Sequence, residues 1–216
     1  MTPDAVVTYL KQHPEFFEEQ ADFLATVMIP HPHGGRAIPL SERQILTLRD
    51  KSRQLEDKLR ELIEFGEEND AIGEKLHRLT LALVGARDVE GAIAALYFNL
   101  REDFAVPHTV LRLWPENKTG KDLAEFGAVS AAARDFAESL AHPYCSAHAM
   151  VDTAEWFGGA AEHLKSYAYV ALKKDRAFGL LAMASEDAQR FYPEMGTLYL
   201  QRLGELAAAS LAGSLA

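Results

Sequence analysis

The feature that most constrains this chain is a run of apolar residues between residues 41 and 84, spaced alternately three and four positions apart. Such spacing places the apolar side chains in a narrow stripe along one side of a helix, as in the seam of a coiled coil. A helix this long needs a partner along its seam, either another subunit or other helices of its own chain. We predict a homodimer, with the dimer contact made by Ile45, Leu48, Leu55, Leu59, Leu62, Phe65, Asn69, Ile72 and Leu76.

The start of this helix carries two sequence signals. Ser41 and Gln44 have the spacing of a capping box, and Leu40 and Ile45 occupy the two positions of a hydrophobic staple. Both signals predict that the helix begins at Ser41. The chain is therefore divided into an N-terminal helical cap (residues 1–40), a long coiled-coil helix (41–84) and a globular domain (85–216).

The apolar spacing has one irregularity. Phe65 follows a second consecutive step of three, which is a stammer that locally overwinds a coiled coil, and Gly66 comes directly after it. Gly66 and Gly73 indicate either close packing between helices or a compliant joint between Leu62 and Gly73. Asn69 occupies a seam position, where a polar residue commonly fixes register and oligomeric state. Its acidic neighbours leave a helix break at this point as the alternative.

Two short helices are predicted in the N-terminal cap. Thr2 and Pro3 form a helix start, and His13-Pro14-Glu15 repeats the same pattern. A loop rich in proline and glycine follows, and it contains His31 and His33. Two histidines without an evident third or fourth ligand indicate exposed turn residues, so no metal site is expected.

After Gly85 the pattern changes to that of an α+β domain. Apolar periods typical of helices and strands alternate, separated by glycine and proline clusters. Two apolar strands on either side of Lys174-Asp175-Arg176 indicate a tight hairpin. The expected elements are helices at 88–103 and 130–141, strands at 109–114, 122–126, 167–173 and 177–184, an irregular segment at 142–164 and a final helix from Pro193.

Composition disfavours several classes of partner. The net charge is −10 and no basic cluster occurs, which argues against binding to nucleic acid or to an anionic membrane surface. No apolar run approaches the roughly 20 residues that span a bilayer, and no secretory signal is evident. The single cysteine, Cys145, is typical of a reducing compartment. We therefore expect a cytoplasmic protein.

The segment Tyr167–Leu172 is followed by Phe178-Gly-Leu-Leu-Ala-Met-Ala-Ser-Glu-Asp187, which has the form G-L-L-A-x-x-S-x-D. This strand pair, and the predicted order of helices and strands, resemble a GAF domain. The resemblance implies a central antiparallel sheet with long helices on one face. It also implies a ligand cavity on the other face, closed by the irregular segment at 142–164.

The most specific motifs of the front half are His13-Pro14-Glu15-Phe16-Phe17 and Ser41-Glu42-Arg43-Gln44, with Glu68-Asn69-Asp70 and Pro143-Tyr144-Cys145 beyond them. Together they resemble a bacterial GAF-like family catalogued as domain-of-unknown-function family 484, and the resemblance extends over nearly the whole chain. It implies a GAF-like domain behind an N-terminal helical extension, with no established activity.

By analogy with GAF domains, eight residues are expected to approach the cavity: Arg112, Trp114, Tyr144, Cys145, His148, Trp156, Tyr167 and Tyr169. Arg112 interrupts an apolar strand, so it is interpreted either as a clamp for a carboxylate or phosphate or as a rim arginine paired with an acid. The resemblance names no ligand or cofactor, because GAF domains bind unrelated molecules.

Cys145 is the strongest single candidate for a reactive residue. A thiol in a pocket-closing loop, with His148 nearby as a base, could act as a nucleophile or sense oxidants. A lone cysteine among alanines is more often a small buried apolar residue. GAF-like reductases of free methionine sulfoxide need several cysteines, so that activity is not expected here.

Three functional hypotheses remain. The first is a non-enzymatic sensory or regulatory module, homodimeric through the long helix, that binds a small molecule and signals to a partner protein in trans. The second is an adaptor whose cavity is collapsed and whose N-terminal helices dock a protein. The third, a thiol-dependent enzyme using Cys145, has the least support.

Overall fold

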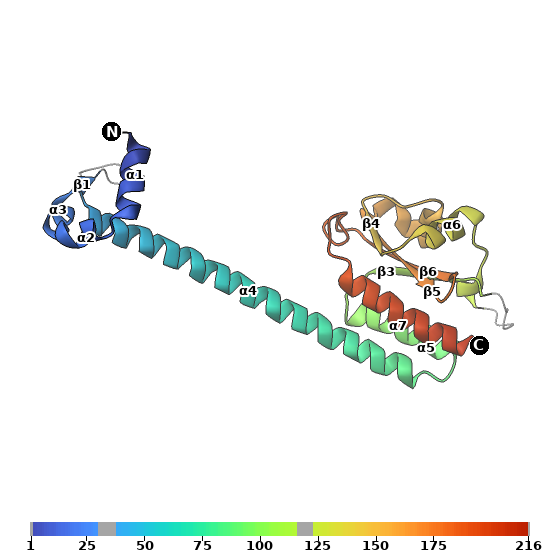
Figure 1. Cartoon of the computed structure of the whole chain (residues 1–216). Coiled ribbons are helices and arrows are strands. Elements are labelled where there is room, and N and C mark those ends of the chain that lie inside the picture. The colour runs from blue at the N-terminus through green and yellow to red at the C-terminus, as the bar shows by residue number, and fades with distance from the viewer. Residues whose placement is uncertain (1, 30–37, 116–122, 216) are drawn as a thin grey trace. The chain divides into compact units, whose positions relative to one another are not determined.

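The structure is a computed structural model that describes residues 2–29, 38–115 and 123–215, apart from the side chains of residues 25, 38, 40 and 41. The chain divides into two units, Met1–Glu67 and Glu68–Ala216. The division falls inside the long helix α4 (Leu40–Gly85), which contributes to both units (Figure 1).

The first unit consists of short helices and the beginning of α4. Its elements are α1 (Pro3–Gln12), α2 (Glu15–Glu19), α3 (Ala21–Thr26), β1 (Met28–Ile29) and β2 (Ile38–Pro39). The Thr2 hydroxyl accepts a hydrogen bond from the Ala5 backbone N–H at 3.3 Å, so the predicted cap of α1 is confirmed. The second expected helix is divided into α2 and α3, and β1 and β2 pair as a two-residue antiparallel ladder. The histidines His31 and His33 lie outside the described residues.

Helix α4 is continuous over 46 residues, which confirms the predicted long helix and excludes a break at Asn69. The expected capping box and staple involve the side chains of Ser41 and Leu40, which lie outside the description. A Cβ atom placed on Gly66 or Gly73 would meet nothing within 4 Å. Close packing within the chain is therefore not the reason for either glycine.

The second unit is built on a four-stranded antiparallel sheet in the order β3-β6-β5-β4. Its strands are β3 (His108–Leu113), β4 (Tyr144–Ser146), β5 (Ser166–Lys173) and β6 (Ala177–Ser185). The expected hairpin is confirmed as β5–β6. The segment expected to pair as a strand at 122–126 instead contains a short 3-10 helix, η1 (Ala124–Phe126). Strand β4 falls in the segment expected to be irregular, which also holds the 3-10 segment η2 (Thr153–His163).

Two helices of this unit begin at a residue whose side chain caps them, and the final helix does not. Asp88 caps α5 (Val89–Glu102) by accepting from the Gly91 N–H at 2.8 Å. Ser130 caps α6 (Ala131–Ser139) by accepting from the Ala133 N–H at 3.0 Å. The final helix, α7 (Leu198–Ser214), begins five residues after the predicted start at Pro193, because a run of turns separates the proline from the helix.

The two faces of the sheet are covered by different elements. Ala168, Val170 and Leu172 of β5 join a core with α5 and α7, whereas Tyr167 and Tyr169 join a second core on the opposite face. Figure 1 shows α5 and α7 along one face and α6 over the other. Helix α7 approaches β5 closely, since a Cβ on Gly204 would lie 2.3 Å from Cγ1 of Val170. The α+β prediction, with a central antiparallel sheet and flanking helices, is confirmed.

The C-terminal half of α4 belongs to this second unit. Leu76, Leu79 and Leu83 are buried in the core shared with α5 and α7. Two hydrogen bonds from Arg78 to a carboxylate oxygen of Asp103, at 2.7 and 3.0 Å, fix the helix to the end of α5. Each leucine contributes about 2 kcal/mol through burial, so apolar packing provides most of this attachment.

Candidate functional site

The N-terminal half of α4 exposes an apolar stripe. Its members are between 50% and 70% exposed, and we call them the α4 stripe: Ile45, Leu48, Leu55, Leu59, Leu62 and Phe65. Beyond Gly66 the same spacing continues, but Ile72 is half-buried and Leu76 is buried. The stripe is therefore the part of the predicted seam that the described part of the chain leaves uncovered.

Two residues expected at the dimer contact are used within the chain instead. The side-chain oxygen of Asn69 accepts a hydrogen bond of 2.8 Å from the hydroxyl of Tyr199 on α7. Leu76 is only 7% exposed, because α5 and α7 cover it. Asn69 and Leu76 thus connect α4 to its own domain; Leu76 is covered there, whereas Asn69 remains exposed.

The described residues of the N-terminal cap form no closed core. No described side chain between Thr2 and Glu67 is buried. Six large apolar side chains of the cap are well exposed: Val6, Val7, Tyr9, Phe17, Phe23 and Met28. Apolar surface of this density usually marks a contact with another protein. The cap and the α4 stripe are consequently the strongest candidates for an interaction surface.

The face of the sheet where a ligand cavity was expected is filled by the chain's own aromatic residues. Tyr169 is fully buried, and its hydroxyl accepts from the Met150 N–H at 3.0 Å and bonds the Thr153 hydroxyl at 2.8 Å. Phe136 packs edge-on against Tyr169 at 5.4 Å between ring centroids, and Phe157 packs against Tyr167 at 5.9 Å. Tyr167 and Tyr169 therefore belong to a packed core.

Arg112, Trp114 and Trp156 lie on this same face, and each is already engaged. The guanidinium of Arg112 lies 5.6 Å from the Trp156 ring centroid and donates to the Ala124 carbonyl at 3.0 Å. The indole N–H of Trp114 donates to the Ala177 carbonyl at 2.8 Å. Among the described residues, the partners of Arg112 are thus backbone carbonyls and a ring, and no acid pairs with it.

The remaining three expected cavity residues come from β4 and the loop after it, and they diverge. Cys145 is opposite Ala168 and enters the core on the helix side of the sheet, whereas Tyr144 is 42% exposed and contacts Phe136 on the other face. His148 is exposed, and the described residues contain no hydrogen bond between its ring and Cys145. Burial raises the pKa of the Cys145 thiol, which lowers its thiolate fraction at neutral pH.

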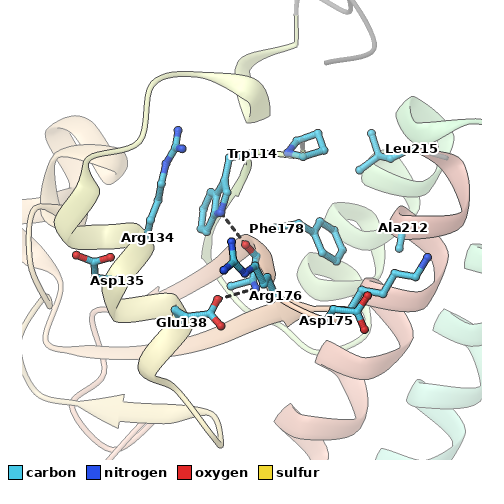
Figure 2. Close-up of a pocket in the computed structure, with 12 residues that line it drawn as sticks. Trp114, Arg134, Asp135, Glu138, Asp175, Arg176, Phe178, Ala212 and Leu215 are labelled. Atoms are coloured by element: carbon cyan, nitrogen blue, oxygen red, sulfur yellow. Dashed lines mark hydrogen bonds between the residues drawn. The ribbon is translucent and has the colours of Figure 1, made fainter. Parts of the chain in front are cut away.

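A cleft of about 740 Å³ lies at the end of the sheet where β3 ends and the β5–β6 turn begins. Figure 2 shows Trp114, Arg134 and Arg176 on one side of it and Phe178, Ala212 and Leu215 on the other. The Arg134 guanidinium lies 5.8 Å from the Trp114 ring centroid, and Glu138 accepts from the Ala177 N–H at 2.8 Å. This hollow combines an aromatic wall with charged groups.

Sequence reasoning identified only Trp114 among the residues that line this cleft. Arg134 and Arg176 form no side-chain hydrogen bond or ion pair within the part of the chain that the structure describes. Arg134 lies over the Trp114 ring, but guanidinium groups whose N–H donors are unused among the described residues are suited to a carboxylate or phosphate. The sequence does not indicate that Arg134 and Arg176 lie close together. Arg134 is on α6 and Arg176 is in the β5–β6 turn, and only the folded sheet brings these two elements side by side.

Among the described residues, no group of three or more His, Cys, Asp or Glu side chains could hold a metal ion. No helix in the described ranges is long and apolar enough to cross a bilayer.

The placement of Cys145 predicts low reactivity. We expect iodoacetamide to alkylate it at least about tenfold more slowly in the native protein than in urea, because the thiol is buried and its pKa is raised. His148→Ala should leave the native rate unchanged, since its ring makes no contact with the thiol. The measurement is the alkylation rate by mass spectrometry, and a native rate equal to that of a free thiol would contradict the prediction.

Comparison with known proteins places the chain in a family. Uncharacterized protein YigA of Salmonella typhimurium (strain LT2) is 25% identical over 210 residues, which cover 92% of this chain and 86% of that protein. The GAF domain of the potassium sensor histidine kinase KdpD from Escherichia coli is 17% identical with a TM-score of 0.39, over 66% of this chain and 94% of that one. The family described as "Protein of unknown function, DUF484" matches residues 1–212, in agreement with the N-terminal motifs, and this chain belongs to that family.

Proposed function

We propose that this protein is a non-enzymatic regulatory adaptor that forms a homodimer through the α4 stripe and acts on a partner protein in trans. The observation that carries the proposal is the exposure of the stripe, whose six large apolar side chains are 50–70% exposed along one side of a helix. The single cysteine fits a cytoplasmic setting for this role.

The α4 stripe supports pairing with a second copy. An isolated helix is marginal in water, so most of its stability must come from packing of its apolar side. In the C-terminal half of α4, apolar residues with the same spacing are covered by α5 and α7. In the N-terminal half the stripe is narrow and follows the three-and-four spacing of a coiled coil, which another helix with the same pattern matches.

The packing on the sheet favours an adaptor over a sensor with a ligand in the expected GAF-type cavity. Tyr167, Tyr169 and Phe157 occupy the face where a GAF-type cavity was expected. Cys145 and His148 point to different environments, which weakens the case for a thiol-dependent enzyme. A ligand sensor and a thiol-dependent enzyme therefore have less support. The exposed apolar residues of the cap and the α4 stripe favour contact with another protein.

The dimer is tested by light scattering after size-exclusion chromatography at micromolar concentration. The full chain should have twice the chain mass. Leu55→Asp places a charge in the stripe and should weaken the dimer by roughly two orders of magnitude, because two buried leucines are lost. Gln54→Asp, the neighbouring position on another side of α4, is the matched control and should stay dimeric.

A monomeric wild-type chain, or a Leu55→Asp variant as dimeric as Gln54→Asp, would refute the role of the stripe.

We propose, as a second function, that the cleft between α6 and the β5–β6 turn binds a small anionic molecule with a planar apolar part. Its volume of about 740 Å³ lies within the range of small-molecule sites. Trp114 offers only its ring face, since its N–H is bonded to Ala177, while Arg134 and Arg176 retain their donors for an anion. Such a ligand would add regulation to the adaptor.

The cleft is tested by titration with 8-anilino-1-naphthalenesulfonate, which combines aromatic rings with a sulfonate. We expect saturable fluorescence enhancement that falls several-fold in Arg134→Gln/Arg176→Gln, because both free guanidinium groups are removed. Arg60→Gln on the exposed part of α4 is the control and should bind the dye like the wild type. Identical titration curves for all three proteins would refute ligand binding in the cleft.

A further inference from the structure

The charges beside the α4 stripe carry information about how two copies pair. Treating Ile45 as position a of a heptad places Ser52 and Leu59 at a, and Leu48, Leu55 and Leu62 at d. Between residues 49 and 63 the flanking positions e and g then hold Arg49, Lys51, Glu56, Lys58 and Ile63, and Phe65, after the irregularity in spacing, falls at g. Charges at e and g set partner choice and helix orientation in coiled coils.

In a parallel pair with matched register, position g of one helix faces position e of the next heptad on the other helix. Lys51 of each copy then faces Glu56 of the other, which gives two attractive pairs by symmetry. Lys58 faces the apolar Ile63, and no like charges meet. Lys51 forms no ion pair among the described residues, and Glu56 uses one carboxylate oxygen to accept from Ser52 at 3.1 Å. The second oxygen is left for a lysine.

In an antiparallel pair, the longest overlap of the stripe places Ile45 opposite Leu62 and Ser52 opposite Leu55. Positions g then face each other, so Lys51 meets Lys58 twice. Two contacts between Arg49 and Glu56 only offset these repulsions. This pairing also sets Ser52 against a leucine in two layers, whereas a parallel pair gathers both serines in one layer.

We infer that two chains pair in parallel and in register along the α4 stripe, with Lys51 of each copy facing Glu56 of the other. This inference rests on the proposed dimer and adds its geometry. Parallel pairing brings the two N-terminal caps to the same end of the paired helices. The exposed side chains of both caps, such as Tyr9, Phe17 and Phe23, then form a single apolar surface contributed by two copies.

Disulfide trapping in the full chain tests the orientation. In Ile45→Cys/Leu62→Cys, a parallel pair links 45 to 45 and 62 to 62, whereas the antiparallel pair links 45 to 62. Copies of residue 45 in the antiparallel pair are about 25 Å apart along the axis, too far for a disulfide. Peptide mapping of the oxidised dimer reads out the links. The wild type, with only buried Cys145, and Gln54→Cys are controls that should not cross-link.

Charge reversal gives a second readout that needs no cysteine. Glu56→Lys should raise the dimer dissociation constant about tenfold, since two attractive pairs become repulsive. Lys51→Glu should raise the dissociation constant to a similar extent, because the new carboxylate faces Glu56 in the parallel arrangement, whereas in the antiparallel arrangement it would face Lys58 and tighten the dimer. A Lys51→Glu variant that dimerises more tightly than the wild type would count against the inference.

The outcomes separate the two proposals. A monomeric wild type overturns the proposed function and the inference together. A dimer that links 45 to 62, or that forms neither link on oxidation, overturns the parallel arrangement while leaving the dimer intact. Links between identical positions, together with a weaker dimer in Lys51→Glu, support it.

Discussion

The rest of the structure depends on which side chains cover the apolar side of α4 from Ile45 to Leu83. From Leu76 to Leu83 the cover comes from α5 and α7 of the same chain, reinforced by Arg78–Asp103. From Ile45 to Phe65 the described part of the chain provides no such cover. The change occurs around Gly66 and Asn69, where the spacing pattern is also irregular.

This change of partner explains the polar residue in the stripe. Asn69 is bonded to Tyr199, so it marks the point at which α4 begins to belong to the sheet domain. In the proposed dimer α4 has two partners, and a rotation of its N-terminal half would be transmitted through backbone hydrogen bonds to the half that packs on α5 and α7. The region between Leu62 and Gly73, which the sequence indicates as a possible joint, would then lie between the two contacts.

Both faces of the sheet are largely covered in the described part of the chain. One face is covered by helices and holds Cys145, and the other is filled by Tyr167, Tyr169 and their neighbours. The cleft beside Arg134 and Arg176 lies at the end of the sheet. In the proposed adaptor, this domain would be a stable base for α4, and the cleft would be a peripheral place for a regulator.

The sequence predicted the elements whose signals are local. The three-and-four spacing identified α4, Asp88 identified the start of α5, and two apolar runs around Lys174-Asp175-Arg176 identified the hairpin. Spacing alone could not tell which chain covers Leu76, because the pattern is the same for an internal and an external partner. The face of the sheet on which the Cys145 side chain lies depends on the pairing of β4 with β5. A strand of three residues is too short to be predicted from the sequence pattern.

The cleft was missed for a similar reason. Arg134 and Arg176 are far apart in sequence and ordinary in their surroundings, and only the position of α6 over the sheet brings them to one hollow. The filled aromatic face was predicted only as the second hypothesis, because the eight expected cavity residues were identified by analogy, which gives residue types but not their packing. Tyr169 is an example, since its hydroxyl is used by Thr153 and Met150.

Hydrogen–deuterium exchange of α4 at two protein concentrations tests the division of this helix most directly. If a second copy covers residues 45–65 and the chain itself covers residues 76–83, dilution below the dimer dissociation constant should speed amide exchange in the first segment only. Protection of residues 76–83 should stay constant, because it depends on α5 and α7. Exchange that is independent of concentration throughout, or that rises equally in both segments, would contradict the division.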